Sequence, residues 1–471
     1  MFRIKPVLTP SLWEAVLLTI ITIAIMFTSI VIYETDPHIP LAIVLLLLMM
    51  YGLSKKVSYK QLEEGITEGA KAGMAAVFLF FFIGILIAAW MFAGTIPTLI
   101  YAGFHLVTPQ FYLAVVFVVC AIVGISVGSS LTTVGTVGVA FVGISSAIDV
   151  SLPMTAGAIV SGAFFGDKMS PLSDTTNMAS SILHVDLFAH IKNMGWTTFP
   201  AFFISLLLFA LISPSMQHAD FSGIETFQSG LLNTGLISWD RAIIPIVVLL
   251  LFSIKKAPAL LALAAGTVSA IIVSFFHEVL PVGEILNILF EGFVSDSGVE
   301  EIDELLTGGG MESMFSTIGI VLLALSLGGL LFTLGIVPKL LSTIEALLKK
   351  VSTVILSSAL TAIGINVLIG EQYLSVLLTG EAYSQQYKKV GLSNINLARV
   401  SEDAGTVVNP LVPWSVCGVF ITSVLNISTV AYLPFTFFCL LSPLLTIFYG
   451  FTGKTLTYVP KEDADGSSPT I

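Results

Sequence analysis

An otherwise apolar segment from Pro153 to Leu183 is interrupted by the polar run Gly166-Asp167-Lys168-Met169-Ser170-Pro171-Leu172-Ser173-Asp174-Thr175-Thr176-Asn177. Pro171 cannot donate an intrahelical hydrogen bond, and Ser173 or Asp174 can cap a helix that restarts after it. The pattern therefore predicts a helical hairpin over about residues 153–183, with a polar tip.

A similar polar run recurs near the C-terminus, through Arg399, Ser401 to Thr406, Asn409-Pro410 and Pro413-Trp414. It predicts a second hairpin over about residues 394–426. Two further apolar segments are too long for one helix. The first, from Phe111 to Asp149, is interrupted at Ser126 to Ser130, and the second is interrupted at Asn366 to Gln372. We expect each of these segments to be one span broken by unwound backbone.

Composition places these segments in a membrane. The 471 residues are 56% hydrophobic and only 10% charged, with a mean hydropathy of +0.99, whereas soluble domains carry roughly a quarter charged residues. Several windows, among them Ser11 to Tyr33 and Ala72 to Gly94, are almost free of charge and long enough to cross a hydrocarbon core of about 30 Å. The chain is expected to be an all-α polytopic membrane protein.

The sequence also repeats itself. Short markers recur in the same order in both halves: Pro40-Leu41-Ala42 with Pro258-Ala259-Leu260, Glu64-Gly65 with Glu291-Gly292, Gly94 with Gly335, Gly128 with Gly370, and Asp167 with Asp403. This predicts two repeats, residues 1–215 and 240–454, joined by an extracellular linker at 216–239 and followed by a cytoplasmic tail at 455–471. Each repeat would hold five crossings and one re-entrant hairpin, about ten crossings in all, and the odd number inverts the second repeat.

Lysine and arginine in short loops support this orientation, because they mark the cytoplasmic side. Arg3, Lys55, Lys192 and Lys454 would lie inside, whereas the loop from Glu278 to Glu312, with nine acidic residues and no basic ones, would lie outside. Both termini are then cytoplasmic. Two features do not fit, namely Arg241 at an outer helix end and the Lys388 and Lys389 pair in an outer loop.

The helix breaks carry the candidate site. Irregular backbone at membrane depth must be buried in protein or line a cavity, and intramembrane charges indicate function. Oxygen ligands suit a hard cation such as sodium, and burial favours the protonated form of a carboxyl group, so one site can exchange a proton for a cation. The candidate cation and proton ligands are Asp167, Asp174, Ser173, Thr175, Thr176, Asn177, Ser129, Ser130 and Thr133 in the first half, and Glu371, Gln372, Glu402, Asp403, Thr406 and Asn409 in the second.

Two basic residues at the breaks have alternative roles. Lys168 and Arg399 either neutralise Asp167 and Asp403 or Glu402 as structural pairs, or hold an anionic substrate. Arg399 precedes Asp403 by four residues, which favours pairing between them.

Several other classes of function are excluded. Nothing in the chain is basic enough for nucleic acid, and the acidic balance of −11 comes from loops. The three cysteines have no C-x-x-C spacing and suggest neither a metal centre nor a disulfide framework. Gly124-Ile125-Ser126-Val127-Gly128 matches a serine-hydrolase pattern, but it lies inside a span rather than on a strand-turn-helix elbow. We therefore expect no enzyme and no cofactor.

The run Phe165 to Asn177 resembles the signature of the NhaC-type sodium/proton antiporter family, and Arg399 to Thr406 followed by Asn409 to Trp414 resembles its partner motif. The resemblance implies a multi-pass exchanger in a bacterial plasma membrane, within the ion-transporter superfamily, with sodium bound where both hairpin tips meet. The family also includes exchangers of malate with protons against lactate with sodium, so carboxylates are the alternative cargo. One departure is Gly128-Ser129-Ser130-Leu131-Thr132-Thr133, where many members resemble G-T-S-W-G-T. A homodimer is left open.

Overall fold

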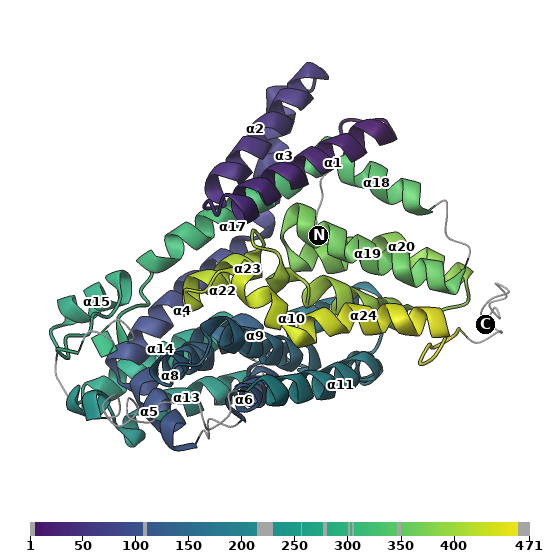
Figure 1. Ribbon diagram of the computed structural model, residues 1–471. Helices are drawn as coiled ribbons and strands as arrows, with labels where there is room; N and C mark the ends of the chain where they lie inside the picture. Colours follow the sequence, from purple (N-terminus) through teal and green to yellow (C-terminus); the bar gives the residue numbers. More distant parts are fainter. Residues whose placement is uncertain are drawn as a thin grey trace, which may run out of the picture.

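The computed structural model describes residues 5–106, 111–213, 229–255, 257–276, 280–299, 302–303, 306–345 and 350–459. Within these ranges the chain is helical and contains no β-strand, only two isolated β-bridges. Figure 1 shows long helices packed side by side, with α1, α2 and α3 at the top of the view. The all-α class predicted from the sequence is confirmed.

The helices follow the apolar windows of the sequence. In the first half they are α1 (Leu12–Phe27), α2 (His38–Ser54), α3 (Tyr59–Ala72), α4 (Met74–Phe92), α5 (Thr95–Leu106), α6 (Tyr112–Val127), α7 (Ser130–Thr133), α8 (Val139–Ala147), α9 (Leu152–Met169), α10 (Asp174–Ile182) and α11 (Leu187–Ile212). In the second half they are α13 (Trp239–Ile254), α14 (Ala259–Ser274), α15 (Val282–Glu291), α17 (Phe315–Thr333), α18 (Ile336–Glu345), α19 (Val351–Ile369), α20 (Gln372–Lys389), α21 (Asn394–Ser401), α22 (Val416–Leu425), α23 (Thr429–Tyr432) and α24 (Phe437–Thr452).

Three π-helical segments adjoin these helices in the described part of the chain. Thr28–Ile32 follows α1, Val134–Gly138 joins α7 to α8, and Glu402–Thr406 continues α21. Because π-helical turns are uncommon and often mark functional sites, the segment after α21 draws attention to Glu402 and Asp403.

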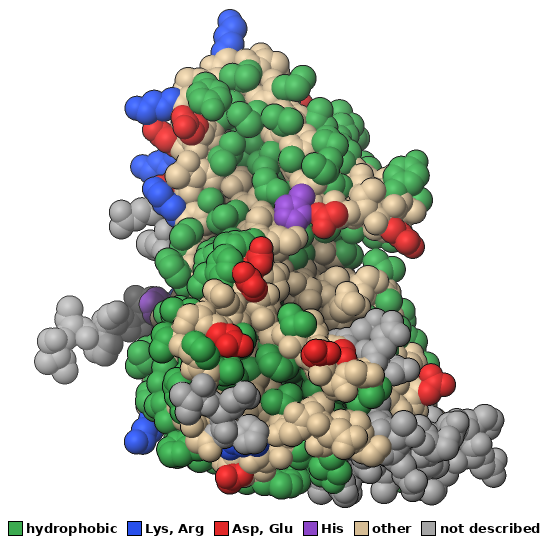
Figure 2. Space-filling model, turned by 90° about the vertical axis from the view of Figure 1, so that its left-hand side faces the viewer, with side chains coloured by type: hydrophobic (Ala, Val, Ile, Leu, Met, Phe, Trp, Pro, Cys, Tyr) green, Lys and Arg blue, Asp and Glu red, His purple; other side chains and the backbone are tan. Residues whose placement is uncertain are grey.

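Many helices are long and apolar enough to cross a membrane. Among the described residues six helices meet that criterion, or up to eight if each of two bent helix pairs counts as one span, and α2, α6 and α14 are shorter apolar helices. Large hydrophobic side chains such as Leu207, Leu211 and Ile20 remain exposed on them. Figure 2 shows hydrophobic side chains over much of one face, with acidic side chains among them. This pattern suits a surface that contacts lipid.

The two long broken segments turn at the same backbone geometry. Helix α6 ends at Gly128 (φ 71°, ψ 29°) and α19 ends at Gly370 (φ 74°, ψ 18°), both left-handed conformations that glycine adopts without a Cβ penalty. The next residues, Ser129 and Glu371, are extended and cap the following helices by accepting from Thr132 N and Leu374 N. Gly128 and Gly370, which correspond to each other in the repeat, therefore have the same local structure.

These two segments are hairpins rather than bent spans, which differs from the sequence expectation. The Ser358 and Thr361 side chains on α19 bond Tyr387 Oη and Tyr383 Oη on α20 at 2.8 and 2.9 Å, so the two helices run antiparallel. Likewise, the Tyr112 hydroxyl at the start of α6 donates to the carbonyl of Phe141 in α8. The sequence showed where each segment breaks, but a break alone does not give the angle between its helices.

The segment predicted as the second hairpin is broken at its polar run. The helices before and after Val412 to Ser415 are bent by 43°, so a break is present there, and the re-entrant hairpin stays a prediction. In the first half, α9 ends at Met169 and α10 restarts at Asp174, with Ser173 accepting from Thr176 N as its cap. The predicted break in this segment, with Ser173 as its capping residue, is thus confirmed.

Helices α6 and α9 touch through glycine. A Cβ on Gly166 would lie 2.6 Å from the Cα of Gly124 and 2.5 Å from the carbonyl oxygen of Ala121, so no larger residue fits there. Small residues let membrane helices approach closely and gain contact area. This approach holds the α9 segment, with Asp167 and Lys168 at its end, against the Gly128 tip.

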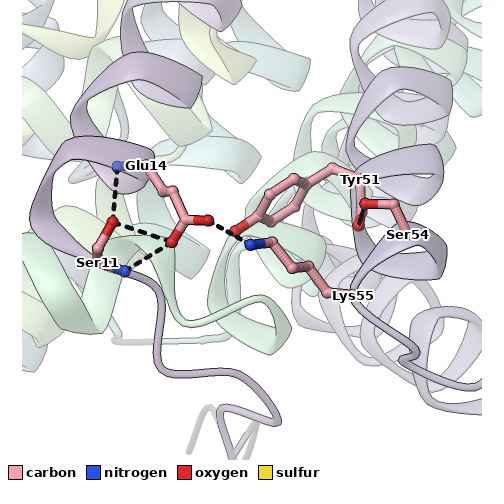
Figure 3. A network of polar contacts seen from close by, with 5 residues as sticks. All are labelled: Ser11, Glu14, Tyr51, Ser54 and Lys55. Atoms are coloured by element: carbon pink, nitrogen blue, oxygen red, sulfur yellow. Dashed lines mark hydrogen bonds and ion pairs between the residues drawn. The ribbon is translucent and has the colours of Figure 1, made fainter.

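A surface network fixes the N-terminal helix. Glu14 forms a capping box with Ser11 and an ion pair with Lys55 at the end of α2 (Figure 3). Both charged side chains are partly exposed, so the ion pair itself contributes little to stability. The network orients α1 against α2, far from the polar breaks.

The inversion of the repeats remains a prediction, tested by cysteine labelling. Ser58→Cys and Asp296→Cys lie at exposed positions, one in each half. We expect an impermeant thiol reagent to label Asp296→Cys only from outside and Ser58→Cys only from inside. The parent protein is the control, since Cys120, Cys417 and Cys439 are buried. Labelling of both positions from the same side would contradict the inverted arrangement.

Candidate functional site

The site is built around an ion pair that joins the two halves. Lys168 at the end of α9 contacts the Asp403 carboxylate in the π-helical segment after α21, and both side chains are fully buried. The Thr197 hydroxyl on α11 donates to the same carboxylate oxygen at 3.0 Å. The sequence placed both residues at the site and left Lys168 either as a partner of Asp167 or as a ligand of an anionic substrate, whereas the structure pairs it with Asp403.

Asp167 is instead held by the tip of the α6–α8 hairpin, at Gly128 to Ser130. Its Oδ2 accepts from the Ser130 backbone N–H at 3.1 Å and from the Ser130 hydroxyl at 2.8 Å. The side chain is 5% exposed and lies close enough to Ser173 to interact with it. The carboxylate of one broken helix is therefore bound by the tip of the hairpin beside it.

Glu402 lies on the other side of the same cluster. Thr175 lies between Ser173 and Glu402, with its hydroxyl 3.1 Å from the Ser173 hydroxyl and 3.5 Å from Glu402 Oε2. Glu402 also lies within electrostatic range of Asp167, Lys168 and Asp403. Its Oε1 and Asp403 Oδ2 have no hydrogen-bond partner among the described residues. The hydroxyls of Ser173 and Thr175 thus lie between two buried carboxyl groups, those of Asp167 and Glu402.

The acids outnumber the bases there. Glu402 lies within electrostatic range of the acids Asp167 and Asp403, and the amine beside them, Lys168, is already engaged by Asp403. Burial of several like charges without compensation is costly, so such a cluster binds cations or protons. No group of three or more His, Cys, Asp or Glu side chains in the described residues is placed to hold a single metal ion. A cation here would depend on hydroxyl and carbonyl oxygens as well as carboxylate.

Asp174 belongs to a different environment. Its side chain is exposed and lines a cavity of about 440 Å³ together with Ser129, Thr132 and Asn177. Leu249, Pro258 and Leu263 form part of the apolar wall. Asp174 therefore lies beside this cavity, whereas Asp167 and Glu402 are buried.

Other predicted site residues stabilise the backbone. Glu371 and Ser129 cap helices, and Asn409 accepts from Cys417 N at 2.9 Å and donates to Asn366 Oδ1 at 2.8 Å. Asn177 donates to the carbonyls of Pro171 and Ser173. The remaining members have these positions: Thr133 donates to Ser129 O, Thr176 donates to Lys168 O, and Gln372 and Thr406 are buried.

Arg399 does not pair directly with Asp403. Its Nη1 donates to the Thr455 carbonyl at 3.2 Å and to the Thr455 hydroxyl at 3.3 Å, so it anchors the chain after α24. Asp403 acts on it only at longer electrostatic range. The one-turn spacing favoured a pair between Arg399 and Asp403, but Asp403 is paired with Lys168 instead.

The sequence missed two residues of this region. One is Thr197, which contacts Asp403. The other is Tyr373, which lies just after the turn between α19 and α20, within electrostatic range of Asp167, Asp174 and Glu371. The Thr197-Thr198 pair beside the largely apolar run from Phe199 to Ile212 was the signal available for the first. For Tyr373 there was none, because its position depends on how the tips meet.

This fold and site define a multi-pass membrane protein with a buried, acid-rich compartment between broken helices. The sequence profile of the Na⁺/H⁺ antiporter family matches residues 162–454. The Na⁺/H⁺ antiporter NhaC of Alkalihalophilus pseudofirmus is 39% identical over 434 residues, 92% of this chain and 94% of its own. The NhaC protein of Bacillus subtilis is 35% identical over 93% of this chain and 98% of its own.

A third relative is named for a different activity. The malate-2H⁺/Na⁺-lactate antiporter of Bacillus subtilis is 32% identical over 96% of this chain and 97% of its own length. The chain belongs to the Na⁺/H⁺ antiporter family. The family resemblance noted from the two motifs is thereby confirmed.

The Lys168–Asp403 pair predicts a rescue. Lys168→Gln leaves Asp403 as an orphan charge and should cost about 3–5 kcal/mol of stability, whereas Lys168→Gln with Asp403→Asn should recover most of it. The measurement is thermal unfolding in detergent. Equal losses in the single and double variants would show that the pair is not the source of the effect.

Proposed function

We propose that the protein exchanges sodium ions for protons across the plasma membrane by alternating access. The observation that carries the proposal is the buried compartment in which Asp167 and Glu402 are joined through Ser173 and Thr175. A carboxylate there binds a sodium ion when deprotonated and releases it when protonated. This competition on one site is sufficient for antiport when the site opens to one side at a time.

The residues have different roles according to where they lie. Asp174 in the 440 Å³ cavity attracts and passes cations, and Asp167 and Glu402 bind them with the hydroxyls of Ser130, Ser173 and Thr175. Lys168 stays bound to Asp403 and keeps the two halves in register. The two halves run in opposite directions, with both termini in the cytoplasm.

Exchange of malate for lactate is the second candidate, supported by the third relative. It would require Lys168 or Arg399 to hold the substrate carboxylate. Both basic side chains already have partners: Lys168 contacts Asp403, and Arg399 donates to the Thr455 oxygens. Binding an organic anion would break these contacts, and this favours the inorganic cation as cargo.

Asp167→Asn is expected to abolish sodium-driven proton movement in proteoliposomes, because an amide keeps the shape but cannot trade a proton for a cation. Asp174→Asn should retain exchange but require more sodium, since its carboxylate lies on the proposed access route. The matched control is Asp296→Asn, an exposed loop position. Wild-type kinetics in Asp167→Asn would remove the carboxylate from the mechanism.

Cargo is tested in the same proteoliposomes. With sodium as the only driving ion, proton movement should proceed without malate or lactate and should be unchanged when either is added. Radiolabelled malate should not accumulate against lactate. Sodium flux that depends on a carboxylate would favour the second candidate.

A further inference from the structure

An apolar groove lies beside the α19–α20 hairpin, between α1, α18 and α19. Its volume is about 600 Å³, and its wall includes Ile23 of α1, Leu340 and Leu341 of α18, and a face of α19 from Ser357 to Leu368. The Leu360 side chain of this face is 55% exposed, so the groove opens on the surface of the protein. Side chains normally fill spaces of this size. We therefore expect a molecule from the surroundings to occupy the groove.

The groove is kept open by a glycine. A Cβ built at Gly364 would have no described atom within 4 Å, although Gly364 lies in the interior of α19. Glycine destabilises a helix interior relative to alanine, and here no close neighbour requires it. Gly370 of the same hairpin differs, because a Cβ there would lie 3.0 Å from the carbonyl oxygen of Trp414. The missing side chain at Gly364 thus leaves room for a ligand rather than for another helix.

The groove has the length of one bilayer leaflet. From Ser357 to Leu368, α19 rises by about 16 Å at about 1.5 Å per residue, and half of a hydrocarbon core measures about 15 Å. The inner end lies next to Gly370, where the chain turns. The outer end points towards Lys350, which precedes α19 and lies about 10 Å beyond Ser357 along the helix. One lipid acyl chain matches this length, with its headgroup at the Lys350 end.

The headgroup end is basic. Lys350 is exposed, and Lys339 lies on α18 among the residues that line the groove. Neither lysine forms an ion pair with a described residue. The acid of α1, Glu14, is already bound by Lys55. Lysine can cover apolar surface with its stem and keep its charge at the interface, and basic residues there attract anionic lipids.

We propose that this groove binds one acyl chain of an anionic phospholipid, with the lipid phosphate at Lys339 and Lys350, and that the bound lipid supports the α19–α20 hairpin. The partner is a lipid of the leaflet in which α19 begins. Its binding does not depend on what the protein transports, whereas its effect on exchange rests on the proposed function.

Two hydrogen bonds connect the groove to the rest of the hairpin region. The hydroxyl of Thr361 in the groove wall lies 2.9 Å from Tyr383 Oη on α20. Trp414, in the bend between α21 and α22, donates from Nε1 to the carbonyl of Val367 at 2.7 Å, and Val367 also lines the groove. A lipid chain packed on this face of α19 therefore holds the helix where it meets both neighbours.

Lipid retention tests the site. The protein would be reconstituted with equal amounts of phosphatidylglycerol and phosphatidylcholine, transferred to detergent and examined by native mass spectrometry. One phosphatidylglycerol per chain should remain on the parent and should be lost from Gly364→Leu, whose side chain fills the groove. Gly283→Leu is the matched control, because Gly283 lies in α15 with equal room for a Cβ and away from the groove. Ser357→Phe fills the outer end and replaces Gly364→Leu if that variant does not fold.

The headgroup is tested by charge removal. Lys339→Gln with Lys350→Gln should reduce the preference for phosphatidylglycerol over phosphatidylcholine by about thirtyfold, since one basic residue near a membrane surface changes the affinity for anionic lipid by about fivefold. The control, Lys60→Gln with Lys192→Gln, removes two exposed charges on α3 and α11 and should leave the preference unchanged.

Retention of the lipid by both Gly364→Leu and Ser357→Phe, or equal retention of the two lipids by the parent, would overturn the proposal. A dimer of the parent that Gly364→Leu abolishes would also overturn it, because a second copy would then occupy the groove. In proteoliposomes, phosphatidylglycerol should accelerate sodium-driven proton movement by the parent and not by Gly364→Leu, and an equal response would refute the support of the hairpin. Absence of exchange in the parent would instead refute the proposed function and leave the lipid result intact.

Discussion

The buried contact between Lys168 and Asp403 is the interaction on which the rest of the site depends. Removing two charges from water costs several kcal/mol per ion, so such a pair persists only where it is well bound. Here it links the end of α9 to the π-helical segment after α21, and Thr197 adds α11. Because Asp403 is engaged by Lys168, the proposed sodium and proton site consists of the acids Asp167 and Glu402.

The second constraint is that backbone groups cannot be left unsatisfied at membrane depth. At Gly128 and Gly370 the chain turns in a left-handed conformation, and Ser129 and Glu371 satisfy the first N–H groups of the next helices. The tip at Gly128 then offers the Ser130 N–H and hydroxyl to Asp167. The turn that ends α6 thus also binds the Asp167 carboxylate, which belongs to the proposed cation site.

The sequence predicted most of the helices and the breaks between them, because both follow from local pattern. Apolar windows gave the spans, and polar runs gave the breaks with Asp167, Lys168, Glu402 and Asp403. It did not predict which breaks reverse the chain. It also failed on partners: Lys168 joins Asp403 across the fold, and Arg399 joins Thr455. Those contacts depend on how helices distant in sequence pack, which spacing along one helix does not contain.

The central claim is that sodium and a proton compete for the same buried carboxylates, and the pH dependence of sodium binding tests it most directly. Sodium affinity would be measured on the purified protein in detergent by calorimetry over a series of pH values. Binding to a carboxylate that must first lose one proton predicts that affinity falls about tenfold for each unit of decreasing pH below the range where that proton dissociates, with proton release on sodium addition. Sodium affinity that is independent of pH, with no proton released, would contradict the account.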